Sequence, residues 1–425
     1  MTREAQPVAL GGPDAAEATG PSQAAWVLSG MQWDLKAMKA DETIAAGARG
    51  AGINVCIVDS GLDDSHQEFA GKVTRLASFV PNSVAQLDSN GHGTHVAGSA
   101  AARGVVMSGV APDASLFGAK VFNASGSSST IQPFLEAIVW CTDNGAHVVN
   151  MSLGGIRYLA GQPASANPDV QAYTTAMDYA TSRGVVVVTS AGNSSLRLPN
   201  VAQITIPAQV PGTIIVGATG PISRNVPVLR PNGLLATVPR NEPPNWNPFD
   251  PAQVVAGPDS RAYYSNFGTG VDVFAPGGRT AHSLSFPLRI TSETVLDSVT
   301  RQPVSPARTA RIQHGTIYDA VWSACSRLST NGGAQDDGGR PGPSQNCRTA
   351  NQANRYVGFQ GTSMAAPHVA GLAAVLYEAA GGARSAEVRA KVERCIRTTT
   401  DDIGASTTFG GGRVNAVRAL ECARS

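Results

Sequence analysis

Short apolar runs alternate with longer stretches of helical pattern along most of the chain, and this limits the possible folds more than any other feature. The apolar runs cover residues 53–58, 115–121, 146–151, 185–190 and 213–216. Stretches compatible with a helix, such as 131–142 and 170–182, separate most of these runs. Strands that alternate with helices in this way are typical of a parallel sheet. The sequence therefore predicts an α/β protein with a mostly parallel central sheet.

Composition and charge exclude several classes of protein. The chain has 425 residues, of which 42% are hydrophobic and 15% charged, so it can bury a large core and is not expected to be disordered. Its 32 basic and 31 acidic residues give a net charge of +1, which offers no polybasic field for nucleic acid or an anionic membrane. No apolar run approaches the roughly 18 residues that a membrane-spanning helix needs. The beginning of the chain lacks the layout of a signal peptide.

Three stretches fall outside the alternating pattern. Residues 1–25 are rich in Ala, Gly and Pro, and we interpret them as a mobile tail or a processing remnant. The folded domain is expected to span 26–425. Within it, residues from about 221 to 262 are rich in Pro and Asn, and those from about 279 to 355 in Gly, Ser, Arg and Gln. Both are predicted to be insertions, because surface loops accept extra length at little cost.

The six cysteines bear on the cellular compartment. Four of them, at 325, 347, 395 and 422, lie in loop-like or terminal sequence where disulfides are plausible, and Cys325 with Cys347 would link the second insertion. Cys56 and Cys141 have apolar surroundings and are predicted to be buried thiols. The pattern favours a secreted, extracellular protein. Six reduced thiols in a cytosolic protein are the alternative.

Three segments carry residues suited to nucleophilic catalysis. They are Val58–Gly61 (VDSG), Gly91–Gly98 (GHGTHVAG) and Gly361–Gly371 (GTSMAAPHVAG). In this order they resemble the signature blocks of the subtilisin-like serine protease family, the subtilases. The resemblance implies a three-layer α/β/α fold of the subtilisin type and serine endopeptidase activity. By position in the motifs, Asp59 resembles the orienting carboxylate, His92 the general base and Ser363 the nucleophile.

Each of these roles agrees with the local chemistry. Asp59 ends an apolar strand, where a carboxylate needs a strong partner such as an imidazole N–H. Glycines on both sides of His92 allow the backbone to approach closely. Ser363 begins a helical pattern, where free N–H groups favour a developing oxyanion. Pro367 lacks the N–H that would pair with the Ser363 carbonyl, so we expect an irregular first turn.

The family resemblance extends to the substrate cleft. Residues 185–193 resemble the oxyanion-hole block, in which Asn193 would donate its side-chain N–H to the oxyanion. Residues 150–155 resemble the wall of the primary specificity pocket, and 125–128 the facing strand. Thr205 falls where the floor of this pocket is expected, so an uncharged side chain would fit. The predicted substrate-binding residues are Gly126, Ser127, Ser152, Leu153, Gly154, Ser190, Ala191 and Gly192.

No obligatory metal or cofactor is predicted. His95 lies three residues after His92, but the HExxH pattern of a zinc site is missing, so His95 is expected to be a packed helix residue. Many relatives bind structural calcium in a loop after the histidine block, whereas residues 101–107 lack oxygen-bearing side chains here. Glu68, Asp63 and Asp64 remain possible ion ligands elsewhere. The expected partners are polypeptide substrates and a removed prodomain; the chain is expected to be a monomer without nucleic-acid or membrane partners.

Three alternative functions are consistent with parts of the sequence. The first is a dinucleotide-binding protein, but the spacing of Gly91, Gly93 and Gly98 does not match G-x-G-x-x-G. A serine esterase is the second, but Ala365 stands where the G-x-S-x-G elbow requires glycine. The third is a catalytically silent scaffold that binds peptides with the same fold.

Overall fold

The computed structural model describes residues 32–123, 126, 128, 130–221, 227–229, 235–237, 259–262, 264–278, 320–326, 355–404 and 410–425. The predicted tail at 1–25 and most of the two predicted insertions lie outside the described residues. Among the described residues, no helix is long and apolar enough to cross a membrane.

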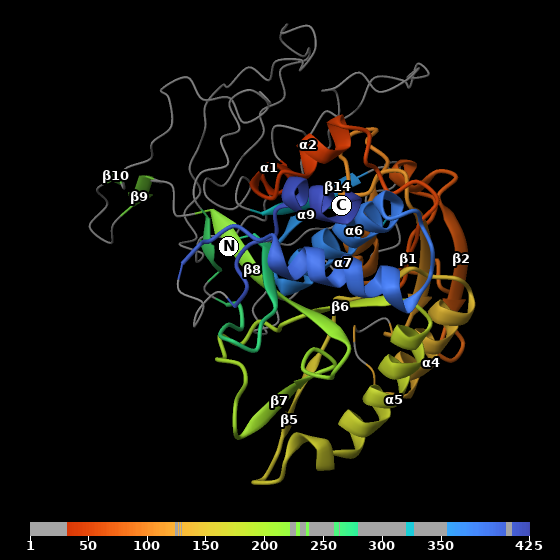
Figure 1. Ribbon diagram of the computed structural model, residues 1–425, viewed down its shortest axis with the longest axis vertical. Coiled ribbons are helices and arrows are strands. Elements are labelled where there is room, and N and C mark those ends of the chain that lie inside the picture. The colour runs from red at the N-terminus through yellow and green to blue at the C-terminus, as the bar shows by residue number, and fades with distance from the viewer. Residues whose placement is uncertain are drawn as a thin grey trace, which may run out of the picture.

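An eight-stranded sheet forms the centre of the fold (Figure 1), in the order β11-β8-β6-β4-β1-β3-β2, with β12 also pairing with β8. Seven of the strands are parallel, and only β11 runs antiparallel to its neighbour β8. The prediction of a mostly parallel sheet is therefore confirmed. The strands are β1 (Asn54–Asp59), β2 (Val73–Ser78), β3 (Ser115–Lys120), β4 (Val148–Met151), β6 (Val186–Ser190), β8 (Thr213–Pro221), β11 (Asp259–Arg261) and β12 (Val273–Pro276).

Helices cover both faces of this sheet, which gives the three-layer α/β/α arrangement expected from the family resemblance. Alternate residues of β1 face opposite layers: Val55 and Ile57 pack with α3 (His92–Ala101) and α6 (Thr362–Ala379), whereas Cys56 and Val58 pack with α4 (Gln132–Asp143) and α5 (Pro168–Ser182). Two further helices, α7 (Ala386–Thr398) and α9 (Ala416–Arg424), lie outside α6 (Figure 1).

The strand order reverses around β1. From β1 the sheet continues through β3 to β2 on one side and through β4 and β6 to β8 on the other. In open parallel sheets, ligands bind beyond the carboxyl ends of the strands at such a reversal. Asp59 is the last residue of β1, so the topology places this carboxylate at the expected position of a binding cleft.

The helix α6 is buried along most of its length. Every residue from Thr362 to Tyr377 is buried, and most of these side chains are apolar or small. Small residues allow α3 and α6 to approach closely: a Cβ atom on Gly371 would lie 2.7 Å from the Ala100 carbonyl oxygen. The Ala-rich sequence of α6 thus suits a helix packed on all sides.

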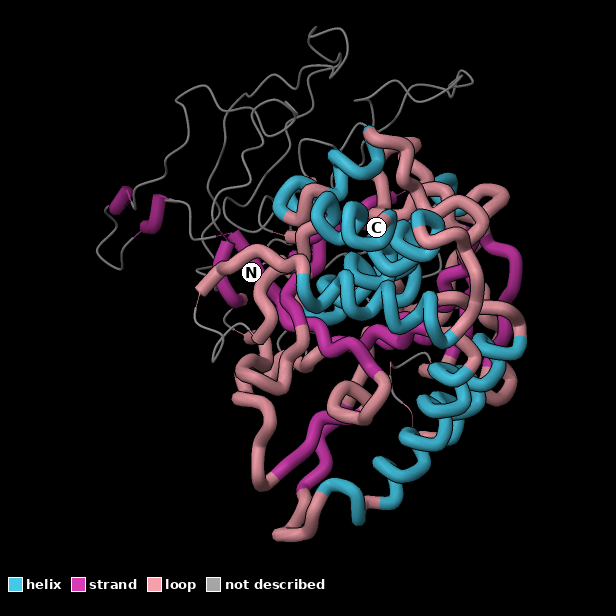
Figure 2. The backbone as a smooth tube through the Cα atoms, viewed as in Figure 1, coloured by secondary structure: helices cyan, strands magenta, loops and turns pink. Residues whose placement is uncertain are grey.

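Smaller elements complete the described fold. β5 (Gly155–Tyr158) and β7 (Gln203–Ile206) form an antiparallel arm at the bottom of Figure 2. β13 (Val321–Cys325) pairs with β14 (Arg355–Phe359) and packs against α3. β13 lies within 279–355 and β11 within 221–262, so these two strands belong to the packed domain. The remaining elements are α1 (Trp33–Ala37), α2 (Ala40–Ala45), η1 (Gln67–Phe69), η2 (Ala164–Ala166), β9 (Pro227–Leu229) and β10 (Leu235–Thr237).

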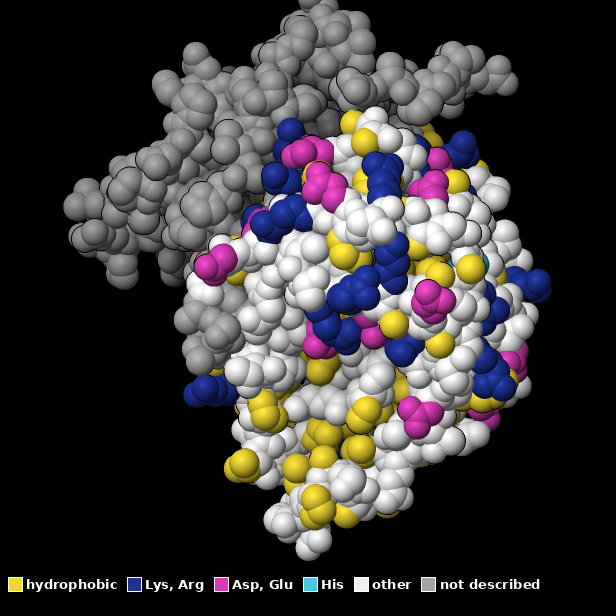
Figure 3. Space-filling view, viewed as in Figure 1, with side chains coloured by type: hydrophobic (Ala, Val, Ile, Leu, Met, Phe, Trp, Pro, Cys, Tyr) yellow, Lys and Arg dark blue, Asp and Glu magenta, His cyan; other side chains and the backbone are white. Residues whose placement is uncertain are grey.

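Lys and Arg side chains form a band on the face shown in Figure 3, in the area of α7. Acidic neighbours balance part of it. Glu393 of α7 lies 2.6 Å from the guanidinium of Arg389 and 3.0 Å from that of Arg397, both one helical turn away. Such i,i+4 pairs stabilise an exposed helix face by a few tenths of a kcal/mol each.

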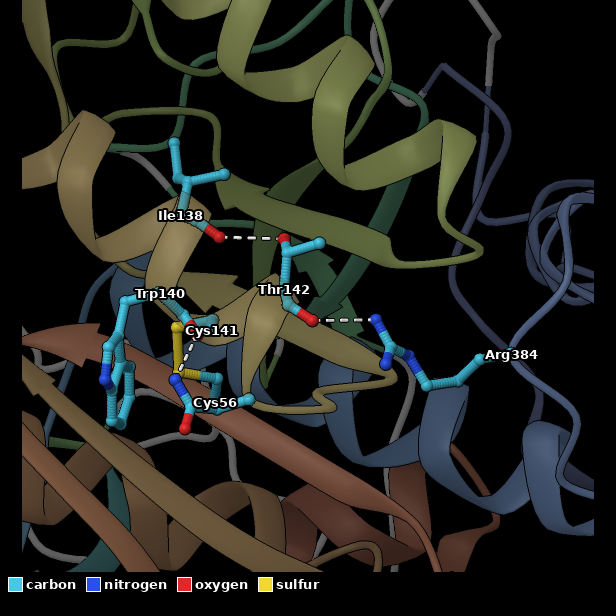
Figure 4. The surroundings of a disulfide bond; sticks show 7 residues. Cys56, Ile138, Trp140, Cys141, Thr142 and Arg384 are labelled. Atoms are coloured by element: carbon cyan, nitrogen blue, oxygen red, sulfur yellow. Dashed lines mark hydrogen bonds between the residues drawn. A yellow bond between two sulfur atoms is a disulfide. The ribbon is translucent and has the colours of Figure 1, made fainter.

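The structure corrects one prediction about the cysteines. Cys56 of β1 and Cys141 of α4 are fully buried, as expected, but they form a disulfide and are not free thiols (Figure 4). The packing of α4 over β1 brings their Cα atoms to 6.0 Å, a proximity that apolar surroundings in the sequence do not reveal. Cys395 and Cys422 are also paired. Cys325 is disulfide-bonded, and Cys347, its predicted partner, lies outside the described residues.

The two fully described disulfides differ in the length of chain that they close, 85 and 27 residues. If their main effect is to restrict the unfolded chain, the Cys56→Ala/Cys141→Ala variant should lose about 4.5 kcal/mol of unfolding free energy. The Cys395→Ala/Cys422→Ala variant should lose about 3.5 kcal/mol. Urea denaturation followed by circular dichroism measures both losses. A larger loss from the shorter loop would contradict this entropic explanation.

Candidate active site

Asp59 and His92 form a hydrogen-bonded pair at the carboxyl end of β1. The imidazole Nδ1 lies 2.7 Å from Asp59 Oδ1, which also accepts the Ser60 backbone N–H. Because the partner is a carboxylate, we assign the neutral-ring proton to Nδ1, which leaves Nε2 with its lone pair. Asp59 is almost fully buried, whereas a quarter of the His92 side chain is exposed. The pair therefore has a buried end and an end that can meet a substrate.

The residue after His92 explains how the pair forms. A Cβ atom on Gly93 would lie 2.1 Å from the Gly61 carbonyl oxygen and 3.1 Å from Asp59 Cβ. Any larger residue would thus push α3 away from the end of β1. The close approach predicted from the glycines beside His92 is present, and Gly93 is the residue that permits it.

Ser363 is the second residue of α6 and lies at the carboxyl end of β4. Its Oγ donates a hydrogen bond to the Ser152 carbonyl at 3.1 Å. In return the Ser152 hydroxyl donates to the Ser363 carbonyl at 2.8 Å. That carbonyl has no helical N–H partner because Pro367 stands four residues later. The first turn of α6 is therefore irregular, as expected from Pro367. The Ser152 hydroxyl, just after β4, takes the place of the missing helical N–H.

Asn193 is held by the residue before Ser363. Its Oδ1 accepts both the backbone N–H and the hydroxyl of Thr362, each at 2.8 Å. With the amide oxygen held by Thr362 in this way, Nδ2 lies on the other side of the amide group, 3.7 Å from where a Cβ on Gly361 would stand. Thr362 also accepts the Gly192 N–H at 3.2 Å. Sequence reasoning missed Thr362, although its place between Gly361 and Ser363 was a usable signal.

Most of the predicted substrate-binding residues lie along two neighbouring segments, which contain Ser152, Leu153 and Gly154 in one and Ser190, Ala191 and Gly192 in the other. The Ser190 hydroxyl reaches the Leu153 carbonyl at 3.5 Å. Thr205 lies beside them, because its Cγ2 is 3.5 Å from where a Cβ on Gly192 would stand.

The facing segment of the predicted cleft is described only in part. Gly126 has a left-handed φ of +74°, and a Cβ there would lie 2.9 Å from the Asn90 side chain, which belongs to the loop before His92. Gly126 therefore lies near the histidine loop. Ser127, also predicted to bind substrate, lies outside the described residues.

Comparison with known proteins agrees with this geometry. The subtilase family model matches residues 50–412. Subtilisin DY of Bacillus licheniformis is 29% identical over 390 residues, and Subtilisin Savinase of Lederbergia lenta is 27% identical over 386; each alignment covers 90% of this chain and 96% of the relative. The chain belongs to the subtilase family. Because it belongs to this family and its relatives are named as proteases, the chain is a serine endopeptidase, which acts on polypeptides.

Two solved protease structures share the fold. A lanthipeptide protease superposes with a TM-score of 0.61 at 21% identity, covering 93% of this chain and 95% of that one. A protease from Pseudoalteromonas arctica gives 0.58 at 24% identity, covering 92% and 97%. None of these comparisons supports the three alternative functions considered from the sequence.

His95 of this subtilase is a packed helix residue, as predicted. It is fully buried, its ring stacks on Phe359 with centroids 4.4 Å apart, and Nε2 lies 3.1 Å from the Val321 carbonyl. Burial, followed by the nearby His92, lowers the pKa of His95 to about 3. No group of residues suited to holding a metal ion occurs in the part of the chain that the structure describes.

Glu68 is surrounded by donors. Its buried carboxylate accepts the backbone N–H groups of residues 104–107, at 2.7 to 3.1 Å, and the Tyr356 hydroxyl at 2.8 Å. A carboxylate whose two oxygens already accept five hydrogen bonds has little capacity for a cation. The loop 101–107 is thus built around an anion, while independence from calcium stays a prediction.

The lowered pKa of His95 predicts a specific loss of stability in acid. The unfolded chain, with a histidine pKa near 6.5, binds a proton that the folded chain excludes down to about pH 3. Stability from this group is therefore complete above pH 6.5 and falls as the pH drops, by up to about 1.4 kcal/mol per pH unit.

A His95→Gln variant should lack this contribution, so its unfolding free energy should depend less steeply on pH between 6 and 4. Urea unfolding of both proteins in the inactive Ser363→Ala background would show the difference without self-digestion. Parallel pH curves would contradict the expectation.

Proposed function

We propose that this subtilase cleaves peptide bonds through an acyl-enzyme on Ser363, with His92 as general base and Asp59 as the orienting group. The observation that carries the proposal is the 2.7 Å contact between His92 Nδ1 and Asp59 Oδ1. It leaves Nε2 as the basic nitrogen of a partly exposed ring, as a general base requires. Asp59 stabilises the imidazolium that forms when this ring is protonated.

In the proposed mechanism, Nε2 of His92 takes the Ser363 hydroxyl proton as Oγ attacks the substrate carbonyl carbon. The tetrahedral intermediate collapses, the C–N bond breaks, and the imidazolium returns the proton to the leaving amine. Water then attacks the acyl-enzyme with the same proton transfers and restores the Ser363 hydroxyl. Asn193 Nδ2 and the Ser363 backbone N–H are proposed to stabilise the oxyanion.

The proposed substrate is an extended polypeptide bound between residues 152–154 and 126–128. Backbone hydrogen bonding along both edges would supply affinity for many sequences. Thr205 has no charge, which favours uncharged side chains at the cleaved residue. The disulfides support export to an oxidising compartment. Removal of a prodomain and a monomeric state are also part of the proposal.

The first test is chemical labelling of the nucleophile. We expect a sulfonyl fluoride to modify Ser363 alone, as located by peptide mass spectrometry, and to abolish casein hydrolysis. A Ser363→Ala variant should neither react nor cleave. The cleavage sites in casein should follow uncharged residues. Folded protein that forms no adduct and cleaves no casein would favour the silent peptide-binding scaffold; cleavage after charged residues would contradict the proposed pocket.

The role of Asn193 has its own test. An Asn193→Ala variant should lower kcat by about 10²- to 10³-fold with little change in KM, a magnitude that comes from measurements on subtilisin and was not calculated for this chain. Because the lost donor acts on the oxyanion, ground-state binding should persist. An Asn144→Ala variant, altered at the carboxyl end of α4 and so at the opposite edge of the sheet, is the control. Unchanged kcat in Asn193→Ala would exclude it from the oxyanion hole.

A further inference from the structure

A second buried carboxylate, Asp88, lies close to the Asp59–His92 pair in the loop before α3. It is fully buried, and each of its oxygens accepts two hydrogen bonds. Oδ1 accepts the Ser60 hydroxyl and the Gly91 N–H, both at 2.8 Å. Oδ2 accepts the Thr94 N–H at 2.8 Å and the Thr94 hydroxyl at 2.5 Å. The mechanism proposed above uses none of these groups.

The donors to Asp88 flank both members of the pair. Ser60 directly follows Asp59, and the two other donors stand before and after His92 in the chain. Ser60 Oγ additionally accepts the Gly93 N–H at 2.9 Å. The carboxylate of Asp88 therefore joins the turn after β1 to the first turn of α3. These are the two backbone segments whose relative position sets the contact between Asp59 and His92.

A buried cation accompanies this network. Lys120, the last residue of β3, stands opposite Asp59 in the sheet register, and its Nζ donates to the Ser60 carbonyl. Burial lowers the pKa of Lys120, while the charges of Asp88 and Asp59 oppose that shift. Burial raises the pKa of Asp88, and its hydrogen bonds oppose that shift. The Lys120 ammonium is thus favoured by both carboxylates, and it contacts the same turn after β1 that Asp88 holds.

We infer that Asp88 is a positioning residue, which holds His92 in line with Asp59 and contributes to the charge that surrounds the imidazole. The inference rests on the proposed role of His92 as general base. Besides Asp59, the titratable groups around this imidazole include Asp88 and Lys120, whose charges act on each other, and the neutral ring of His95, whose pKa the nearby His92 helps to lower. A carboxylate that merely stabilised the start of α3 would affect folding and leave kcat and its pH dependence unchanged.

The test compares two buried carboxylates. Asp88→Asn places an amide N–H₂ against groups that already donate, so the link between β1 and α3 should loosen. We expect kcat to fall on the order of 10²-fold with KM changed less than about twofold, because a small misplacement of a catalytic group has that effect. Loss of a negative charge should also shift the acid limb of the kcat profile to lower pH, since the imidazolium loses stabilisation.

Glu68→Gln is the matched control. Glu68 is equally buried and accepts backbone N–H groups, but from the loop that follows the far end of α3. We expect this variant to lose stability in urea while kcat and the acid limb stay as in the wild type. An Asp88→Asn variant with wild-type kcat and acid limb would overturn the inference.

Ser60→Ala keeps the inference testable if Asp88→Asn does not fold. It removes the hydroxyl that links Asp88 with the Gly93 N–H and changes no charge, so kcat should fall while the acid limb stays in place. Wild-type kcat in Ser60→Ala would then overturn the positioning role. Sulfonyl fluoride labelling of the wild type separates the two hypotheses: absence of an adduct on Ser363 refutes the proposed function, whereas a normal adduct with an unaffected Asp88→Asn refutes only the positioning role.

Discussion

The close approach of α3 to the end of β1 is the constraint on which the site depends. Gly93 permits it, because any side chain there would overlap the Gly61 carbonyl. The same approach places His92, in the first turn of α3, within hydrogen-bonding distance of Asp59. It also buries polar groups of the turn after β1 and of the first turn of α3. Those groups need partners once water is excluded. The hydrogen bonds among Ser60, Asp88 and Thr94 meet this need, so a packing requirement and a polar network occur at one place.

The other half of the site depends on a different irregularity. Pro367 interrupts the hydrogen bonding of α6 one turn after Ser363, and such an interruption inside a helix is normally destabilising. Here the freed carbonyl accepts the Ser152 hydroxyl, which itself accepts the Asn150 amide. The break in the helix thus creates an acceptor that attaches the turn of Ser363 to the end of β4. A straight helix would satisfy its own carbonyl and lose this connection.

Much of the fold and the candidate catalytic residues could be predicted from the sequence, but for different reasons. Strands β1, β3, β4, β6 and β8 were predictable because each is a short apolar run, whereas β2, which is partly exposed, and β11 and β12 were not predicted. The candidate catalytic residues were predictable because their motifs are local in sequence. The Cys56–Cys141 disulfide was not, since it requires α4 to pack over one particular face of β1. The place of β13 against α3 was equally hidden in a stretch of unusual composition. Thr362 was overlooked because its partner, Asn193, is distant in the chain. Asp88 was overlooked because its role depends on Ser60, which the fold brings to it from the end of β1.

Charge balance connects the buried parts of the site. Asp59 and Asp88 are both buried and share Ser60 as a hydrogen-bond donor, and neighbouring carboxylates repel each other and favour protonation. Lys120, at the end of the adjacent strand, supplies one positive charge at the same depth. The carboxylates favour the positive charge that His92 acquires when it takes a proton. An environment with this balance disfavours the imidazolium less than an apolar one would, and that is the property a general base needs during acyl transfer.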